Sequence, residues 1–261
     1  MLRATTILMV LGSLVLPAAA HATIETASSG AVTATLSYKG GIGPEIKDLK
    51  LTIAQSGRVV YDEPIKSKQC LTTCWPAGTK NAVHVLDLAG NDELEVVVDL
   101  FTGGASCCEL EQVFSPSAAL DSYVLTEHNF GEDGDRIEHL GPGAGLEFVS
   151  GDSYFACEFT DCAGSGLPIQ IFSFSGGAFH NVTREYPKQI SSNAAFWWKS
   201  YEHNLKNDPT GLIAPWAADE DLLGKTATVS STLAKQVSEH HITERFVKQL
   251  QAFLKKHGYT G

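Results

Sequence analysis

The sequence predicts an α+β fold in which a repeat-built antiparallel β portion, similar to propeller blades, is followed by helices packed on it. Three observations lead to this prediction. Short alternating or apolar segments, bounded by glycine-rich turns, fill the chain from about residue 31 to residue 174. The pattern of residues 83–108 returns 52 residues further on. From about residue 190, apolar residues recur at helical spacing instead.

The first 22 residues have the composition of a secretory signal peptide. Arg3 supplies a positive charge, residues 4–17 form an apolar run, and Ala20-His21-Ala22 offers the small residues that a signal peptidase reads. The run is shorter than the roughly 18 residues that a membrane span needs, and no later stretch is long enough. We therefore expect a secreted or periplasmic protein without a membrane span.

The remaining chain divides by composition into two parts. Residues 23–190 are expected to form a β-rich repeat domain, and residues 191–261 a helical subdomain. The formal net charge of −11 excludes nucleic acids and anionic membranes as partners, because both require a cationic surface.

Six cysteines in an exported chain predict three disulfides. They are clustered in sequence, which favours three local bridges, although spacing alone does not choose among the pairings. Local bridges restrict the unfolded chain little and mainly shape loops. The adjacent pair can bridge itself, or each of its members can reach elsewhere. The three pairs are Cys70 with Cys74, Cys107 with Cys108, and Cys157 with Cys162.

The first strands are predicted by alternation of apolar and polar residues. Residues 31–38 alternate, and residues 49–54 and 58–61 form a hairpin around Ser56-Gly57. Residues 63–80 read as a loop held by the first cysteine pair.

The next segment carries the repeat. Residues 83–88 are a strand, and residues 94–101 are nearly continuous in apolar residues, as in a strand with both faces covered. Further strands are expected at 108–114 and 122–129. In the second copy, Leu146 aligns with Leu94 and Glu147 with Glu95. Its strands are predicted at 146–150, 154–160 and 169–174. Two copies and a partial third do not close a propeller ring.

Helices are expected at 193–205, 216–223, 230–239 and 242–256. Ser191 and Ser192 are the predicted N-caps of the first. Phe196 and Trp197 belong to its apolar face, whereas Trp198 falls off that face and should be the most exposed. These aromatic residues, together with Trp216, could bind a sugar or a partner, or pack in the interior.

The turn after residue 86 resembles a cation-binding loop. Asp87, Asn91 and Glu95, helped by Asp92, could supply oxygen ligands to Ca²⁺, but Ala89 leaves one ligand position empty. The turn of the second copy holds no carboxylate. The alternative is an acidic turn closed by side-chain-to-backbone hydrogen bonds.

Several motifs resemble those of a known group. The segment DLAGNDELEVVVDL, followed by its second copy, is similar to FG-GAP/VCBS-type repeats of integrin-α-like propellers. It resembles more specifically a group of uncharacterised secreted bacterial proteins, over residues 45–258. The resemblance implies a repeat-built β fold and export, and it brings no activity with it. The matching motifs are Gly103–Cys108, Glu147–Asp152, Val182–Pro187 and Trp216–Asp219.

Other motifs do not favour catalysis. Gly151-Asp152-Ser153 resembles the nucleophile block of GDSL-type esterases, but it lies mid-chain and no late Asp-x-x-His follows. His203 and the pair His240-His241 lack the spacing of a metal-binding motif. No cysteine pair has the Cys-x-x-Cys spacing of a dithiol catalyst.

These patterns predict an exported, monomeric, non-catalytic binding or structural module. Its partner is expected to be an extracytoplasmic protein or a carbohydrate, with no cofactor unless Ca²⁺ binds. The alternatives are an extracytoplasmic hydrolase with a site between sheet and helices, or a calcium-stabilised module.

Overall fold

The computed structural model describes residues 22–41, 43–77, 81–104 and 107–260. The predicted signal peptide lies outside this part of the chain, except for its last residue. No helix among the described residues is long and apolar enough to cross a membrane.

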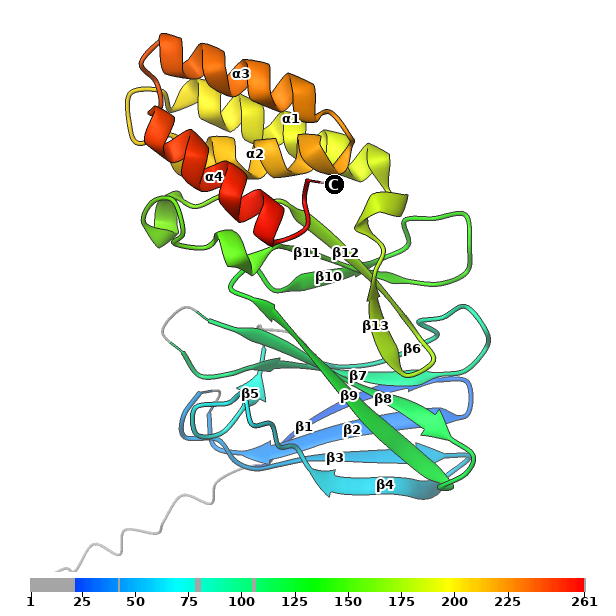
Figure 1. Cartoon of the computed structure of the whole chain (residues 1–261). Helices are drawn as coiled ribbons and strands as arrows, with labels where there is room; N and C mark the ends of the chain where they lie inside the picture. Colours follow the sequence, from blue (N-terminus) through cyan, green and yellow to red (C-terminus); the bar gives the residue numbers. More distant parts are fainter. Residues whose placement is uncertain (1–21, 42, 78–80, 105–106, 261) are drawn as a thin grey trace, which may run out of the picture.

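Three antiparallel sheets follow one another along the chain (Figure 1). The first sheet is a simple meander of β1 (Ala22–Ser29), β2 (Val32–Lys39), β3 (Lys47–Gln55) and β4 (Arg58–Pro64). The second sheet has the order β5-β7-β8-β9, with β6 also paired to β7; its strands are β5 (Trp75–Pro76), β6 (Val83–Leu86), β7 (Glu95–Phe101), β8 (Glu109–Ser117) and β9 (Ser122–Gly131). The third sheet is a meander of β10 (Asp135–Glu138), β11 (Glu147–Gly151), β12 (Ile169–Ser175) and β13 (Ala178–Asn181).

The second sheet is a middle layer because its strand β7 is buried on both faces. Val96 and Val98 join an apolar core shared with the first sheet. Val97, which points the other way, joins a second core with Phe148 of the third sheet. The prediction that residues 94–101 form a strand with both faces covered is therefore confirmed.

The two copies of the repeat share one geometry. Val83 pairs with Val98 in the β6–β7 hairpin, and Asp135 pairs with Ser150 in the β10–β11 hairpin, at positions 52 residues later. In each copy a buried glutamate closes the turn. The backbone N–H of Leu88 donates to Oε2 of Glu95 at 3.0 Å, and that of Leu140 donates to Oε2 of Glu147 at 3.0 Å.

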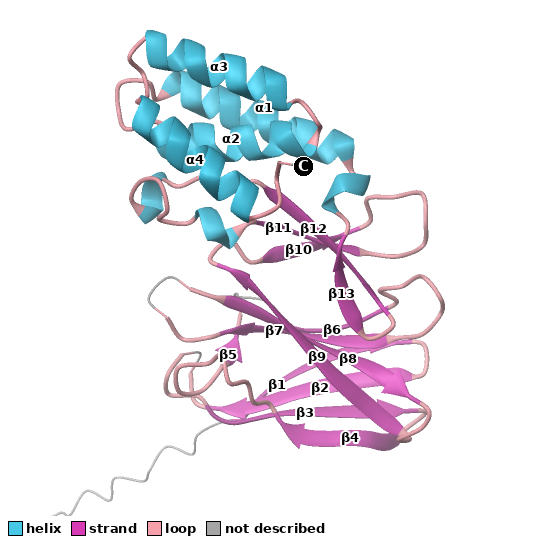
Figure 2. Ribbon diagram, in the orientation of Figure 1, coloured by secondary structure: helices cyan, strands magenta, loops and turns pink. Residues whose placement is uncertain are grey.

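The helices form a fourth layer that covers the third sheet (Figure 2). They are α1 (Pro187–His203), α2 (Thr210–Leu222), α3 (Thr226–Ser238) and α4 (Glu244–Lys256). Ile190 of α1 packs against Ile169 and Ile171 of β12, and the four helices share an apolar core of their own. The predicted packing of helices on a sheet is confirmed.

Three local expectations were wrong. Residues 154–160 are not a strand: they contain the 3₁₀ turn η1 (Ser153–Phe155) and part of a disulfide loop. Ser191 and Ser192 are not N-caps, because α1 begins at Pro187, whose ring lacks an N–H and suits the first turn. Strand β1 was not expected, because its exposed residues give no apolar pattern.

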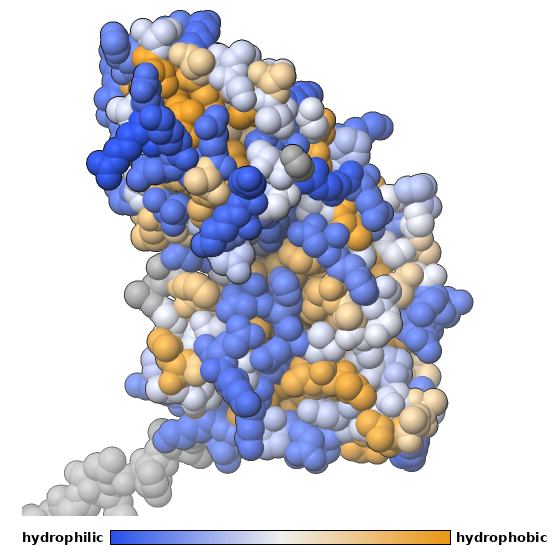
Figure 3. All heavy atoms as spheres, in the orientation of Figure 1, coloured by the Kyte–Doolittle hydropathy of each residue, from blue (hydrophilic) through white to orange (hydrophobic). Residues whose placement is uncertain are grey.

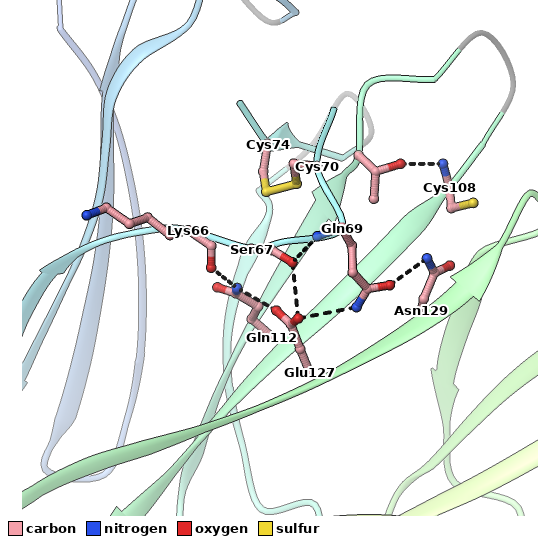
Figure 4. The surroundings of a disulfide bond; sticks show 10 residues. Lys66, Ser67, Gln69, Cys70, Cys74, Cys108, Gln112, Glu127 and Asn129 are labelled. Carbon is pink, nitrogen blue, oxygen red and sulfur yellow. Dashed lines mark hydrogen bonds between the residues drawn. A yellow bond between two sulfur atoms is a disulfide. The ribbon is translucent and has the colours of Figure 1, made fainter. Parts of the chain in front are cut away.

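The disulfides join Cys70 to Cys74, Cys107 to Cys108 and Cys157 to Cys162, so each bridge is local. Beside the first bridge, the carboxylate of Glu127 accepts hydrogen bonds from Ser67 Oγ, Gln69 Nε2 and Gln112 Nε2 (Figure 4). These bonds tie the loop that contains the bridge to the second sheet. Further along, the backbone N–H of Leu71 donates to the carbonyl of Thr102 at 3.0 Å, and the backbone N–H of Cys108 donates to Thr102 Oγ1 at 2.7 Å.

Candidate binding site between the third sheet and the helices

A groove runs between the third sheet and α1. It consists of two adjoining hollows of about 530 and 380 Å³, which share the side chains of Arg136, Val149, Ile169, Asn193 and Phe196. We call it the β11–α1 groove. Its size falls within the range of small-molecule sites in proteins, roughly 300–1,000 Å³.

Helix α1 packs on the sheet through Ile190, and another flank of the helix forms one wall of the groove. Ile190 is 1% exposed against the sheet, whereas Phe196, further along the helix, is 57% exposed. Cys162, in the loop of the Cys157–Cys162 bridge, also lines the groove. The third sheet, helix α1 and the loop of the Cys157–Cys162 bridge thus form its walls.

The aromatic wall is held in place by close packing. Nε1 of Trp197 donates to the carbonyl of Leu167 at 3.0 Å, and the indole leaves no room for a side chain at Gly166. Phe196 packs edge-on against Trp197, with ring centroids 4.8 Å apart. The exposed ring of Phe196 is therefore supported from one side by an immobilised indole.

This arrangement corrects the expectation for Trp198. Its ring packs against Tyr201 and Trp216, at centroid distances of 5.4 and 4.9 Å. The apolar stripe of α1 is wider than predicted because the helix buries one flank on the sheet and another on α2. Phe196, not Trp198, is left exposed.

The polar wall contains an unpartnered acceptor. Oδ1 of Asn193 is buried and has no hydrogen-bond partner among the described residues. A buried amide oxygen without a donor is costly, and a rotation of the Asn193 amide toward the groove would let a ligand hydroxyl supply that donor. Arg136 lies on β10, and its Nε donates a hydrogen bond to Oε1 of Glu138 at 2.8 Å. Asn193 and Arg136 were not singled out in the sequence, and nothing in their local pattern marks them.

The residues of the predicted calcium site lie in one turn, where their oxygens already accept backbone hydrogen bonds. Oδ1 and Oδ2 of Asp87 accept from the N–H groups of Asn91 and Asp92, at 3.0 and 2.9 Å. Oδ1 of Asn91 accepts from Glu93. Glu95 is buried and bonded to Leu88. Within the described ranges, no three His, Cys, Asp or Glu side chains are grouped so as to hold a metal ion.

The turn of the second copy packs directly on the first. A side chain at Gly90 would lie 2.6 Å from the backbone of Ala144 and Gly145. The N–H of Leu146 also donates to the carbonyl of Leu88 at 2.9 Å. Close contact between the two backbones accounts for Gly90 in the first turn and Gly145 in the second.

The Gly151-Asp152-Ser153 segment serves as a tether. Oδ2 of Asp152 accepts from the hydroxyl of Tyr259 at 2.6 Å, and Oδ1 accepts from the N–H of Tyr154. The bond from Tyr259 holds this residue, which follows α4, against the third sheet. In the described part of the chain, no histidine ring is hydrogen-bonded to a serine hydroxyl. His203 and His241 instead bond the carbonyl of Lys199 and the side chain of Gln236.

Most side chains on the face shown in Figure 3 are hydrophilic, and apolar residues form small groups among them, one of which lies over the helices. This mixed surface agrees with the acidic composition of the chain.

Comparisons with known proteins give one informative similarity. No protein-family model matches the chain, and no solved structure matches it significantly. A probable thylakoid lumen protein of Synechocystis sp. is 27% identical over 145 residues, which cover 54% of this chain and 43% of that protein. The chain thus spans less than half the length of this relative. The resemblance to FG-GAP-type repeats has no matching family model behind it.

Proposed function

We propose that the protein is an extracytoplasmic, non-catalytic binding module and that the β11–α1 groove binds a carbohydrate. Three disulfides are typical of proteins outside the cytoplasm, and the similar protein of Synechocystis sp. is described as lumenal. The observation that carries the ligand class is the pairing of an exposed aromatic ring, Phe196, with the buried, unpartnered Oδ1 of Asn193.

Each wall of the groove fits one side of a sugar ring. The C–H face of a pyranose is apolar and packs on an aromatic ring, which here is held by Trp197. A sugar hydroxyl at the other edge donates to Oδ1 of Asn193, and a neighbouring hydroxyl accepts from the Arg136 guanidinium. A neutral polar ligand also suits an acidic protein, since no net charge has to be compensated.

The test is calorimetric titration of the exported protein with three disaccharides: cellobiose, maltose and chitobiose. We expect at least one to bind, and expect Phe196→Ala to weaken it by about tenfold or more, which corresponds to about 1.4 kcal/mol. The matched control is Tyr154→Ala, another exposed aromatic residue outside the groove, 66% exposed. Absence of binding by all three sugars, or equal affinity in the Phe196→Ala variant, would contradict the proposal.

The same disaccharides and variants also distinguish a binding module from the alternative, a hydrolase that acts in this groove. A binding module leaves the disaccharide intact during prolonged incubation. Steady release of monosaccharide, abolished by Phe196→Ala but not by Tyr154→Ala, would replace the binding function with a glycosidase.

A further inference from the structure

The second and third sheets share an apolar core, and at one end of this core the side chains between the sheets become acidic. On β7, Val97 belongs to that core, and Asp99 follows on the same face. On β8, Val113 belongs to it, and Glu111 and Glu109 continue along the same face. Asp135 of β10 approaches from the third sheet.

These side chains line a cleft of about 550 Å³ between the sheets. We call it the acidic cleft, and its polar members are His84, Asp99, Glu109, Glu111 and Asp135. The rest of the lining includes the apolar side chains of Leu86, Ile137 and Leu146. The cleft is separate from the β11–α1 groove, which lies on the helical side of the third sheet.

The negative charge in the cleft is only partly compensated. Asp99 lies directly opposite Glu111 in the strand register, where like charges repel. Nε2 of His84 lies 2.9 Å from Oδ2 of Asp99, and this hydrogen bond raises the pKa of His84, which favours the charged imidazolium beside Asp99. Glu111 has no cationic partner of this kind, because its side-chain hydrogen bonds go to two other acids, Asp99 and Asp135.

Glu111 is the least compensated group. It is 3% exposed, and neither its Oε2 nor Oδ1 of Asp135 accepts a hydrogen bond from an amide, hydroxyl or cationic donor among the described residues. Burial, followed by the charges of Asp99 and Asp135, raises the pKa of Glu111 well above its usual value. Burial likewise raises the pKa of Asp135 to about 7. Glu111 and Asp135 therefore hold a proton where a positive charge would otherwise be needed.

The other charged groups near the cleft do not supply that charge. The pKa of Glu109 is raised by burial and then by Asp99 and Asp133, so these neighbours add negative charge. The negative charge of Glu25, on β1, raises the pKa of His84 and so also adds negative charge near the cleft. Arg136 lowers the pKa of Asp135, but its Nε bonds Glu138. The described lining contains no lysine or arginine.

We propose that the acidic cleft is a binding site for a small organic cation, an alkyl mono- or diamine. Its ammonium group would donate hydrogen bonds to the carboxylates of Glu111 and Asp135 where they line the cleft, and its alkyl chain would contact Leu86, Ile137 and Leu146. The proton that Glu111 and Asp135 hold passes to solvent when the ammonium enters.

An organic cation fits the cleft better than a metal ion. The described side chains contain no metal-binding group of three His, Cys, Asp or Glu residues. The volume is many times that of a single ion, and part of the wall is apolar. A charged head with an aliphatic chain satisfies both halves of the lining.

The test is calorimetric titration of the exported protein with cadaverine at physiological ionic strength. Because the ammonium displaces a proton held by Asp135, whose pKa is raised to about 7, and by Glu111, whose pKa is also raised, we expect saturable one-to-one binding at pH 8 that weakens by about tenfold or more at pH 5.5. The neutral isostere 1,5-pentanediol should not bind. Glu111→Gln should abolish cadaverine binding, whereas Glu63→Gln, at an exposed position, should retain it.

Thermal melts show whether a variant that loses binding is still folded. Glu111→Gln removes a buried acid, so we expect it to remain folded with an unchanged or higher Tm while losing the cadaverine-induced shift in Tm seen for the native protein. The proposal is overturned if cadaverine neither binds nor shifts the Tm of the native protein. It is equally overturned if Glu63→Gln and Glu111→Gln weaken binding alike, which would indicate non-specific attraction to an acidic protein.

Discussion

Asp219 shows how one buried side chain links stability to pH. It is fully buried in α2; Oδ1 accepts from the N–H of Ile169 at 3.3 Å, and Oδ2 has no partner among the described residues. Burial raises its pKa to about 9. The folded state therefore keeps a proton that the unfolded state releases above about pH 4, and the stability contribution of Asp219 falls as pH rises from about 4 to about 9.

Asp219→Asn should remove this pH dependence while keeping the acceptor for Ile169. We expect the variant to gain at least about 1 kcal/mol relative to the native protein between pH 5 and pH 8, measured by urea unfolding. The exposed Asp48, changed to Asn, should show no such gain. An equal difference between native protein and Asp219→Asn at both pH values would show that Asp219 is ionised in the fold.

Individual residues were the hardest to place from sequence. The exposure of Phe196 depends on where α1 leaves the third sheet, which helical periodicity does not encode. The acidic cleft is visible in the sequence as carboxylates within strands: Glu109 and Glu111 lie on one face of a strand, and Asp99 interrupts an apolar strand. Carboxylates at inward positions of buried strands indicate a site.

At the scale of elements, the turn between β6 and β7 is held by its own hydrogen bonds. Both oxygens of Asp87 accept backbone N–H groups, and Asp92 adopts a positive φ of 66° within the turn. The turn therefore has an ordered conformation that does not require an ion.

We predict that EGTA leaves the Tm of the native protein unchanged. Asp87→Ala, which removes the acceptor of two exposed N–H groups, should lower the free energy of unfolding by about 0.5–1.5 kcal/mol with or without EGTA. Asp87→Asn, which keeps one acceptor, should cost less. A fall in Tm on chelation that is absent in Asp87→Ala would instead support the calcium site.

Elements with strong periodicity could be predicted, and those shaped by tertiary contacts could not. The 52-residue repeat is present in the register of two hairpins, and the helix of residues 242–256 corresponds to α4. The strand predicted at 154–160 was wrong because this segment begins with a 3₁₀ turn and enters the loop closed by the Cys157–Cys162 bridge, which local strand propensity does not take into account.

At the scale of the whole molecule, two of the three interfaces between the four layers contain spaces, and these differ in chemistry. Between the second and third sheets, the core changes from valine and phenylalanine to carboxylates. Between the third sheet and α1, the packing ends at an exposed phenylalanine beside an unpartnered amide. Neither space follows from the order of elements, because each depends on how far two layers remain in contact.

Hydrogen–deuterium exchange of the exported protein tests the central claim, that the β11–α1 groove is the binding site. It would be measured with and without a saturating amount of whichever disaccharide binds most tightly. We predict slower exchange in residues 147–151 and 188–197, and unchanged exchange in β6, β7 and β8. Protection confined to another layer, or no protection despite saturation, would contradict the claim.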